Sequence, residues 1–349
     1  MIYLLLTADS FAESARDELR RIGGYRIIGE QHNLIIADVR ARPGRMSALD
    51  GAKFIHGYFP LMRSSRIDKK RYMPAIREGI SGLKLDKKAR VRLECLDVNC
   101  RMGYSAKDIE VAVGRGLERR GYSIDLVDPE ILAYCVLMDG VCYSGFVRLS
   151  EHAHPFIDPF RHNKEKSVSR AEFKIMEAFL EFGLKPPRVA IDLGAAPGGW
   201  SLFLARSGAS VIAIDSGGLE YGKIRRMGVV VKRMKPGGAA IKSADLKPGS
   251  IIHIRCRLEE AAGMLKNIRA DFIGDDINVG GMASSGAVLR YSRFMKENAV
   301  LIMTVKCMHR NVGRYIGEVE SMLKPRFGMV RWRVLPHNRQ EITLFARKR

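Results

Sequence analysis

A glycine-rich segment, residues 192–201 (DLGAAPGGWS), constrains the fold most, because it joins an apolar strand-like run to a helical pattern. Glycines at such a junction allow a tight turn and let the backbone approach a ligand closely. About twenty residues later, the run VIAIDS ends near Asp215, where a carboxylate can accept both hydroxyls of a ribose. The segment lacks GxGxxG and GK[ST], and Pro197 removes an N–H that a pyrophosphate would use. These features favour a nucleoside cofactor without phosphates.

From about residue 168 the chain alternates apolar strand-like runs with helical or loop segments. The runs are VAIDLG, VIAIDS, GVVVK, SIIHIR, DFIGDD and AVLIMTVK. This alternation predicts a parallel sheet with helices on its faces. The closing runs GMVRWRVLP and EITLFARK, joined by HNRQ, predict a hairpin that adds an antiparallel strand. We therefore expect residues 168–349 to form a Rossmann-like α/β domain.

The segment 192–201 resembles the cofactor motif of the FtsJ-like (RrmJ-like) ribose 2′-O-methyltransferase family, and the resemblance extends over roughly residues 168–348. It implies S-adenosylmethionine as the cofactor. Family members often hold the adenine with an acid after the third strand, where HIRCRLEEA offers only Glu259 nearby. The residues that the resemblance assigns to the cofactor site are Asp192, Gly194, Ala195, Pro197, Gly198, Gly199, Trp200, Asp215 and Asp275.

Methyl transfer to an alcohol requires in-line placement of donor and acceptor and removal of the hydroxyl proton. A lysine desolvated beside other cations can act as the base. Four residues suit this chemistry, namely Lys174 in SRAEFKIMEAF, Asp275 in DFIGDD, Lys306 at the end of AVLIMTVK and Glu341 in NRQEITLF. Asp275 and Lys306 fall at carboxyl ends of parallel strands, where doubly wound folds place their ligands. Taken singly, Lys174 also suits a solvated helix and Glu341 a strand edge.

In order and context these residues resemble the Lys-Asp-Lys-Glu tetrad of the FtsJ-like family, and RAEFK resembles its R-x-x-F-K pattern. The resemblance implies that Lys306 removes the 2′-hydroxyl proton and that Asp275 orients it. It also implies that Lys174 stabilises oxyanion charge while Glu341 positions the lysines or the ribose. Asp276 follows Asp275 where the family usually has an apolar residue and then proline, so Asp276 is the second choice for the acidic role.

Three other activities remain to be weighed. Amino-group methylation usually shows [DN]PP[YF] after the fourth strand, and GDDINV lacks it. Cytosine C5 methylation, an RNA base methylation, needs a nucleophilic cysteine. Cys307 follows a strand, but no Pro-Cys pair accompanies it. A non-catalytic RNA-binding protein with a methyltransferase fold would show damage to the loop or tetrad, which the sequence does not.

The N-terminal region divides into two patterns. Residues 1–63 follow a βαββαβ order, with a short helix expected near 46–52, and predict a ferredoxin-like α+β module. Residues 64–150 contain a helix, a strand, an amphipathic helix over 107–120 and a hairpin around Asp139-Gly140. Residues 151–167, rich in proline, histidine and charge, predict a linker.

The order of elements in 64–150, with RVRLECLDVN and GYSIDLVDPEILAYCVL, resembles a THUMP module. The resemblance implies binding of structured RNA, often the end of a tRNA. Arg115, Arg119 and Arg120 could contact phosphate, or could simply favour the helix C-terminus through its dipole. A THUMP-like region before an FtsJ-like domain also resembles bacterial large-subunit rRNA cytidine ribose methyltransferases, which leaves tRNA and rRNA both open.

Charge supports a polyanionic partner, since 59 Lys and Arg oppose 38 Asp and Glu for a formal net charge of +21. Such a surplus favours salt-sensitive phosphate contacts. The six cysteines form no CxxC pair or zinc-ligand spacing, so we expect free thiols and no metal. The opening MIYLLLTADS reads as a strand, and no apolar run is long enough to span a bilayer, which predicts a soluble, cytoplasmic protein.

Overall fold

The computed structural model describes residues 1–39, 49, 51–68, 72–100, 103–150, 167–307 and 311–349. The chain forms two compact units, Met1–His162 and Asn163–Arg349. Of the predicted linker, all but Ser167 lies outside the described residues, as does most of the short helix expected near 46–52. Within the described ranges, no helix combines the length and apolarity that crossing a membrane requires.

The first unit begins with an antiparallel sheet of order β2-β3-β1-β4. Its elements are β1 (Ile2–Leu6), α1 (Ala12–Ile22), β2 (Tyr25–Gln31), β3 (Leu34–Val39) and β4 (Gly57–Leu61). This is the strand order of a ferredoxin-like sheet. Alternation along β1 and β3 buries Leu4, Leu6 and Ile36 on one face.

The first unit also contains a sheet of order β5-β9-β8-β6-β7. Its elements are β5 (Arg63–Arg66), α3 (Tyr72–Ser81), β6 (Arg90–Asp97), α4 (Ala106–Glu118), β7 (Ser123–Ile124), β8 (Ile131–Met138) and β9 (Val141–Arg148). Asp139 and Gly140 both have positive φ, as a tight turn between β8 and β9 requires, which confirms the predicted hairpin. Helices α3 and α4 cover one face, and the first sheet packs on the other. The resemblance to a THUMP module stays a prediction.

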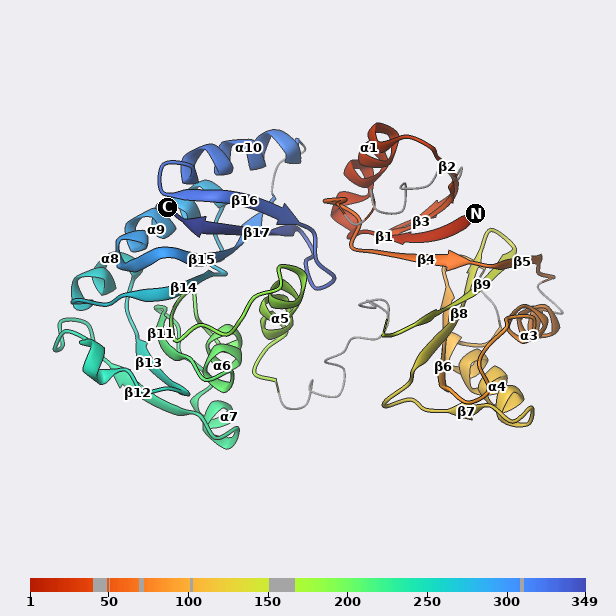
Figure 1. Ribbon diagram of the computed structural model, residues 1–349, viewed down its shortest axis with the longest axis horizontal. Coiled ribbons are helices and arrows are strands. Elements are labelled where there is room, and N and C mark those ends of the chain that lie inside the picture. The colour runs from red at the N-terminus through yellow and green to blue at the C-terminus, as the bar shows by residue number, and fades with distance from the viewer. Residues whose placement is uncertain (40–48, 50, 69–71, 101–102, 151–166, 308–310) are drawn as a thin grey trace. The chain divides into compact units, whose positions relative to one another are not determined.

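The second unit contains an eight-stranded sheet of order β12-β13-β11-β10-β14-β15-β17-β16 in the part that the structure describes (Figure 1). Its strands are β10 (Val189–Leu193), β11 (Ser210–Ile214), β12 (Val230–Met234), β13 (Ser250–Ile254), β14 (Ala270–Asp275), β15 (Met295–Lys306), β16 (Phe327–Arg333) and β17 (Glu341–Lys348). Its helices are α5 (Ala171–Glu181), α6 (Gly199–Arg206), α7 (Tyr221–Arg226), α8 (Leu258–Ala261), α9 (Gly281–Tyr291) and α10 (Val312–Leu323). Strands β10 to β15 pair in parallel, and β17 pairs antiparallel with β15 and β16.

This arrangement confirms the predicted Rossmann-like fold and its terminal antiparallel hairpin. The chain leaves β10 towards β11 on one side and later returns to β14 on the other, so the strand order reverses between β10 and β14. Ligands of open α/β sheets bind outside the carboxyl ends of the strands at such a point. The fold therefore predicts a ligand site at the loop after β10 and at the end of β14.

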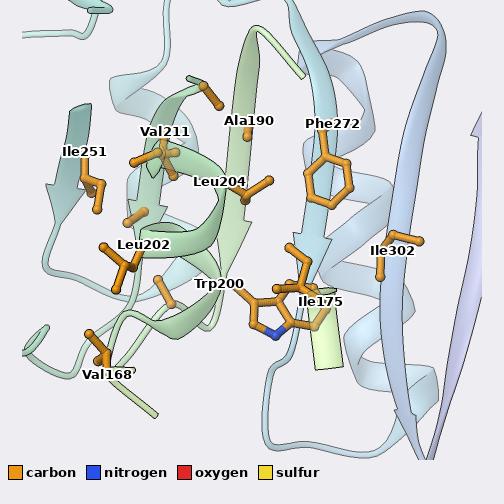
Figure 2. Packing of buried hydrophobic residues seen from close by; sticks show 14 of the residues in the cluster. Val168, Ile175, Ala190, Trp200, Leu202, Leu204, Val211, Ile251, Phe272 and Ile302 are labelled. Atoms are coloured by element: carbon orange, nitrogen blue, oxygen red, sulfur yellow. The ribbon is translucent and has the colours of Figure 1, made fainter. Parts of the chain in front are cut away.

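One apolar core supports the loop after β10 at the carboxyl ends of the parallel strands. Trp200, Ile175 and Phe272 lie together in it, between helices α5 and α6 and the central strands (Figure 2). Because protein interiors pack at high density, the loop that precedes α6 is held against a closely packed surface.

Candidate active site

The loop between β10 and α6 adopts a conformation that its glycines allow. Gly194 has φ +75°, and a Cβ atom there would lie 2.9 Å from the Cα atom of Ile277. Gly198, which precedes α6, has φ +113°, and Gly199 is the first residue of that helix. The loop therefore presses against the backbone that follows β14, and residue 194 has room only for glycine. Ala195 and Pro197 lie between these glycines, with a cis bond before Pro197.

Asp215 ties the loop to the adjacent strand. It follows β11, and its carboxylate accepts a hydrogen bond from the Ala196 N–H at 2.9 Å and one from the Gly217 N–H at 2.7 Å. The side chain is half-buried at the carboxyl edge of the sheet. An acid held there can face the ribose of a nucleoside bound across the loop.

The indole of Trp200 packs beneath the loop, and the assignment of residue 200 to the cofactor site stays a prediction. Its indole is 3% exposed, and its Nε1–H donates to the Ala171 carbonyl at 2.8 Å. A Cβ atom at Gly274 would lie 2.8 Å from the indole, so the ring fills the space above β14. The reason is geometric, since residue 200 lies on the sheet-facing side of α6 and joins the core there (Figure 2).

Asp192 also lies beneath the loop rather than beside it. Its side chain is fully buried, and the Ser201 hydroxyl donates to its carboxylate at 2.5 Å. Burial raises the pKa of Asp192 to about 7, against the opposing effect of the bond from Ser201. Asp192 therefore fixes the start of α6 to β10.

The acid that lies between the two lysines is Asp276, and the expectation of Asp275 there is wrong. Asp276 Oδ1 lies 3.3 Å from Lys174 Nζ and 3.6 Å from Lys306 Nζ. Asp275 is fully buried, and its carboxylate accepts from the Ser284 hydroxyl and, at 3.4 Å, from the Ile277 N–H. Consecutive strand residues point to opposite faces, so only one of the two aspartates can face the lysines.

Glu341 completes a cluster of four charged side chains. Its Oε1 lies 2.5 Å from Lys174 Nζ and 3.9 Å from Lys306 Nζ. Lys306 and Glu341 are direct partners in the β15–β17 ladder, while Lys174 reaches them from α5. We name Lys174, Asp276, Lys306 and Glu341 the polar cluster. It lies at the carboxyl edge of the sheet, beside the loop after β10.

Two members of the polar cluster, Lys174 and Glu341, are held in their charged forms. Burial acts against the charge of Lys174, but the carboxylates of Asp276 and Glu341 outweigh it and raise the pKa of that amine. Burial likewise acts to raise the pKa of Glu341, and its contacts with Lys174 and Lys306 lower it overall. The side chain of Lys306 is 19% exposed, against 8% for Lys174 and for Glu341. Lys306 is therefore the more accessible of the two amines.

Thr304 belongs to this site, and the sequence reading missed it. Its buried hydroxyl donates to Asp276 Oδ1 at 2.6 Å. Thr304 lies two residues before Lys306 on β15, so both side chains point to the same face of the sheet. The two-residue spacing from Lys306 could have singled out Thr304 in the sequence, but it does not show which group the hydroxyl of Thr304 contacts.

Other residues singled out from the sequence lie elsewhere. Glu259 is on α8 with its side chain 66% exposed, and its ion-pair partner among the described residues is Arg290 at 3.8 Å, away from the loop. Burial raises the pKa of Cys307 to about 12, which keeps its thiol protonated and does not favour a nucleophilic cysteine. Arg115 and Arg120 are exposed at the end of α4 and just beyond it, in the first unit. Among the described residues, no group of His, Cys, Asp and Glu could hold a metal ion.

Part of this chain is similar in sequence to known proteins. Residues 167–247 match the FtsJ-like methyltransferase family. The ribosomal RNA large subunit methyltransferase M of Shewanella halifaxensis is 30% identical over 150 residues, which cover 39% of this chain and 41% of that protein. An uncharacterized protein of Methanocaldococcus jannaschii is 27% identical over 164 residues, 46% of this chain and 39% of that one.

Among solved structures, TrmN from Thermus thermophilus aligns over 100% of both chains with a TM-score of 0.43 and 13% sequence identity. The curated relatives are matched over less than half of their own lengths. The matched segment contains the loop after β10, Lys174 and Asp215. The match to the FtsJ-like methyltransferase family therefore covers the first part of the second unit, from α5 to beyond β12.

Proposed function

We propose that this protein transfers a methyl group from S-adenosylmethionine to a ribose 2′-hydroxyl of structured RNA, either tRNA or rRNA. The observation that carries the proposal is the polar cluster, which places two lysines and two carboxylates within contact distance beside the glycine-rich loop. Such a group of charges can bind a hydroxyl, accept its proton and stabilise the resulting charge.

The loop fits the proposed cofactor. Gly194 and Gly198 keep side chains out of the turn, and Asp215 presents a half-buried carboxylate at the end of the next strand. Pro197 and the absence of GK[ST] disfavour a phosphate-bearing ligand. When bound, S-adenosylmethionine supplies an electrophilic methyl group on a positively charged sulfur. Asp192 and Trp200 support this loop from beneath.

Within the polar cluster we assign the proton acceptor to Lys306. It is the more exposed amine, and its distances to the two carboxylates are longer than those of Lys174. As the hydroxyl oxygen takes the methyl group, the bond from that carbon to the cofactor's sulfur would break and leave a neutral thioether, and the O–H proton would pass to the lone pair of an uncharged Lys306 Nζ. Lys174, held by Asp276 and Glu341, remains a cation that stabilises the developing oxyanion. Thr304 positions Asp276.

Two alternatives are less well supported. Methylation of an RNA base through a cysteine would use Cys307, whose thiol is kept protonated by burial. A non-catalytic RNA-binding protein would have no need for a buried charge cluster, which costs free energy to desolvate. RNA as the substrate is supported by the net charge of +21 and by the names of the relatives. The THUMP-like reading of residues 64–150 points the same way.

The proposal is tested by incubating the purified protein with methyl-labelled S-adenosylmethionine and with either total tRNA or unmodified rRNA. Nucleosides from the digested RNA are then identified by mass spectrometry. We expect a 2′-O-methylnucleoside from one of the two RNAs. A labelled base would support base methylation instead, and cofactor binding without any labelled RNA would favour the non-catalytic reading.

The loop itself yields a separate prediction. We expect Gly194→Ala to weaken S-adenosylmethionine binding more than about tenfold, which corresponds to about 1.4 kcal/mol. The added Cβ atom would press on the Ile277 backbone, so the loop must shift. Isothermal titration calorimetry measures the affinity, and thermal melting measures stability.

Gly228→Ala is the matched control, because Gly228 also has positive φ but an added Cβ there meets no atom within 4 Å. Backbone strain should lower the folding stability of the Gly228→Ala variant by about 1–2 kcal/mol, while its affinity for S-adenosylmethionine stays unchanged. Equal loss of affinity in both variants would show that backbone strain alone, and not the close approach to Ile277, decides cofactor binding.

A further inference from the structure

We infer that α7 and the edge strand β12 form a docking surface, which binds the sugar–phosphate backbone of the substrate RNA away from the methylated ribose. The inference rests on the proposed function for the identity of the RNA. The surface lies in the second unit, on the opposite side of the cofactor loop from the polar cluster.

The sequence of this surface is one-sided in charge. Residues 221–242 contain seven Lys and Arg and no Asp or Glu. All seven cations are exposed. They are Lys223, Arg225, Arg226, Lys232, Arg233, Lys235 and Lys242. We name this set the edge patch. Because the overall ratio is 59 basic to 38 acidic residues, an acid-free run of this length is a local concentration of charge.

The cations of the edge patch are mostly unneutralised. Lys232 lies 3.9 Å from Asp245, and this is the only salt bridge that the seven make within the described residues. Arg233 lies over the ring of Tyr221 at 5.2 Å, which holds its guanidinium at the surface. Exposed cations without carboxylate partners attract phosphates, and each contact releases counterions.

The backbone of the edge patch is rigidly attached to the cofactor loop. The Glu220 N–H donates to the Pro197 carbonyl at 2.9 Å, and Ile224 packs against Gly198. α7 is therefore fixed to the turn that precedes α6. RNA bound by the edge patch would be held in a constant position relative to the cofactor site.

The separation from the polar cluster suits one continuous RNA. Five strand steps lead from β12 to β15, and at about 4.8 Å per step they span about 24 Å along the carboxyl edge. That distance exceeds the reach of the target nucleotide itself. The edge patch would therefore bind neighbouring nucleotides and contribute affinity and register rather than chemistry.

A different explanation of these cations is protection of an exposed sheet edge. Val230 on β12 is 69% exposed, and lysines on edge strands discourage pairing with other chains. The two explanations differ in what charge removal changes. If the cations only protect the sheet edge, removing them should cause aggregation without loss of RNA affinity. If they bind RNA, removing them should make RNA binding weaker and less sensitive to salt.

The test uses the full chain with Arg225, Arg226, Lys232 and Lys235 replaced by Gln. Fluorescence anisotropy with labelled, unmodified tRNA and large-subunit rRNA transcripts gives Kd at several salt concentrations. We expect Kd to rise on the order of 100-fold at low salt and the slope of log Kd against log salt to fall by about 2 to 3. Calorimetric affinity for S-adenosylmethionine should be unchanged.

The matched control removes the same charge elsewhere in the second unit, before the amino ends of β10 and β16, where Lys185, Arg188, Lys324 and Arg326 are exposed. Their replacement by Gln should leave Kd and the salt slope near those of the wild type. The inference is overturned if the edge-patch variant binds RNA normally, or if both variants weaken binding equally. Because this readout needs no methyl transfer, an inactive protein that still shows the edge-patch effect would refute the proposed reaction and not the docking surface.

Discussion

Replacing Lys306 with alanine should reduce methyl transfer to RNA by about 10²- to 10⁴-fold while leaving S-adenosylmethionine affinity unchanged. The reason is that Lys306 is the accessible amine of the polar cluster, 3.6 Å from Asp276 and 3.9 Å from Glu341, and lies at the end of β15. Its loss removes the proton acceptor without altering the loop after β10. Single-turnover transfer of a labelled methyl group measures kcat, and calorimetry measures cofactor binding.

The control is Lys324→Ala, which removes an exposed lysine at the end of α10 and should preserve the rate. A Lys306→Ala variant that keeps the full rate would exclude Lys306 as the proton acceptor. Loss of cofactor affinity in the same variant would instead indicate a role in binding.

Substituting the two adjacent aspartates separately should have very different effects on kcat. Asp276→Asn is expected to lower kcat at least about 100-fold, since it removes the carboxylate that contacts both lysines and accepts from Thr304. Asp275→Asn is expected to change kcat by less than about tenfold, because Asp275 faces Ser284 on the other side of the sheet. Parallel kcat and thermal-melting measurements on both variants provide the comparison.

Asp275→Asn should instead alter the pH dependence of stability. Burial raises the pKa of Asp275 in the folded protein from 3.8 to about 8, so the folded state keeps a proton that the unfolded chain loses. The stability contributed by that proton is complete below about pH 4 and is lost as pH rises towards 8. Asparagine cannot titrate, so the fall in melting temperature over this range should become shallower. Asp192, with a pKa of about 7, acts in the same direction and remains in the variant.

If Asp275→Asn abolished transfer and Asp276→Asn did not, the assignment of the acidic role from contact geometry would be wrong. An unchanged pH profile of melting for Asp275→Asn would show that its carboxyl is ionised in the folded protein. The two readouts are independent, since one reports proton transfer at the site and the other reports proton uptake on folding.

The sequence by itself determined the strands of the second unit. Apolar runs separated by helical segments predicted a parallel sheet, and the terminal runs predicted an antiparallel hairpin, because short-range periodicity decides which residues can face a core. The glycines after β10 also predicted a tight turn, since few residues other than glycine adopt positive φ without strain. The sequence also predicted three of the four residues of the polar cluster, namely Lys174, Lys306 and Glu341.

Only the tertiary structure decided which aspartate completes the polar cluster. Asp275 and Asp276 are neighbours with the same chemistry, and the face that each one takes depends on the pairing of β14 with β10 and β15. The burial of Trp200 and the contact of Thr304 with Asp276 depend likewise on packing between segments far apart in the chain. Periodicity identifies a face that is buried, but contacts across a sheet arise from the register and packing of distant elements, which local sequence does not encode.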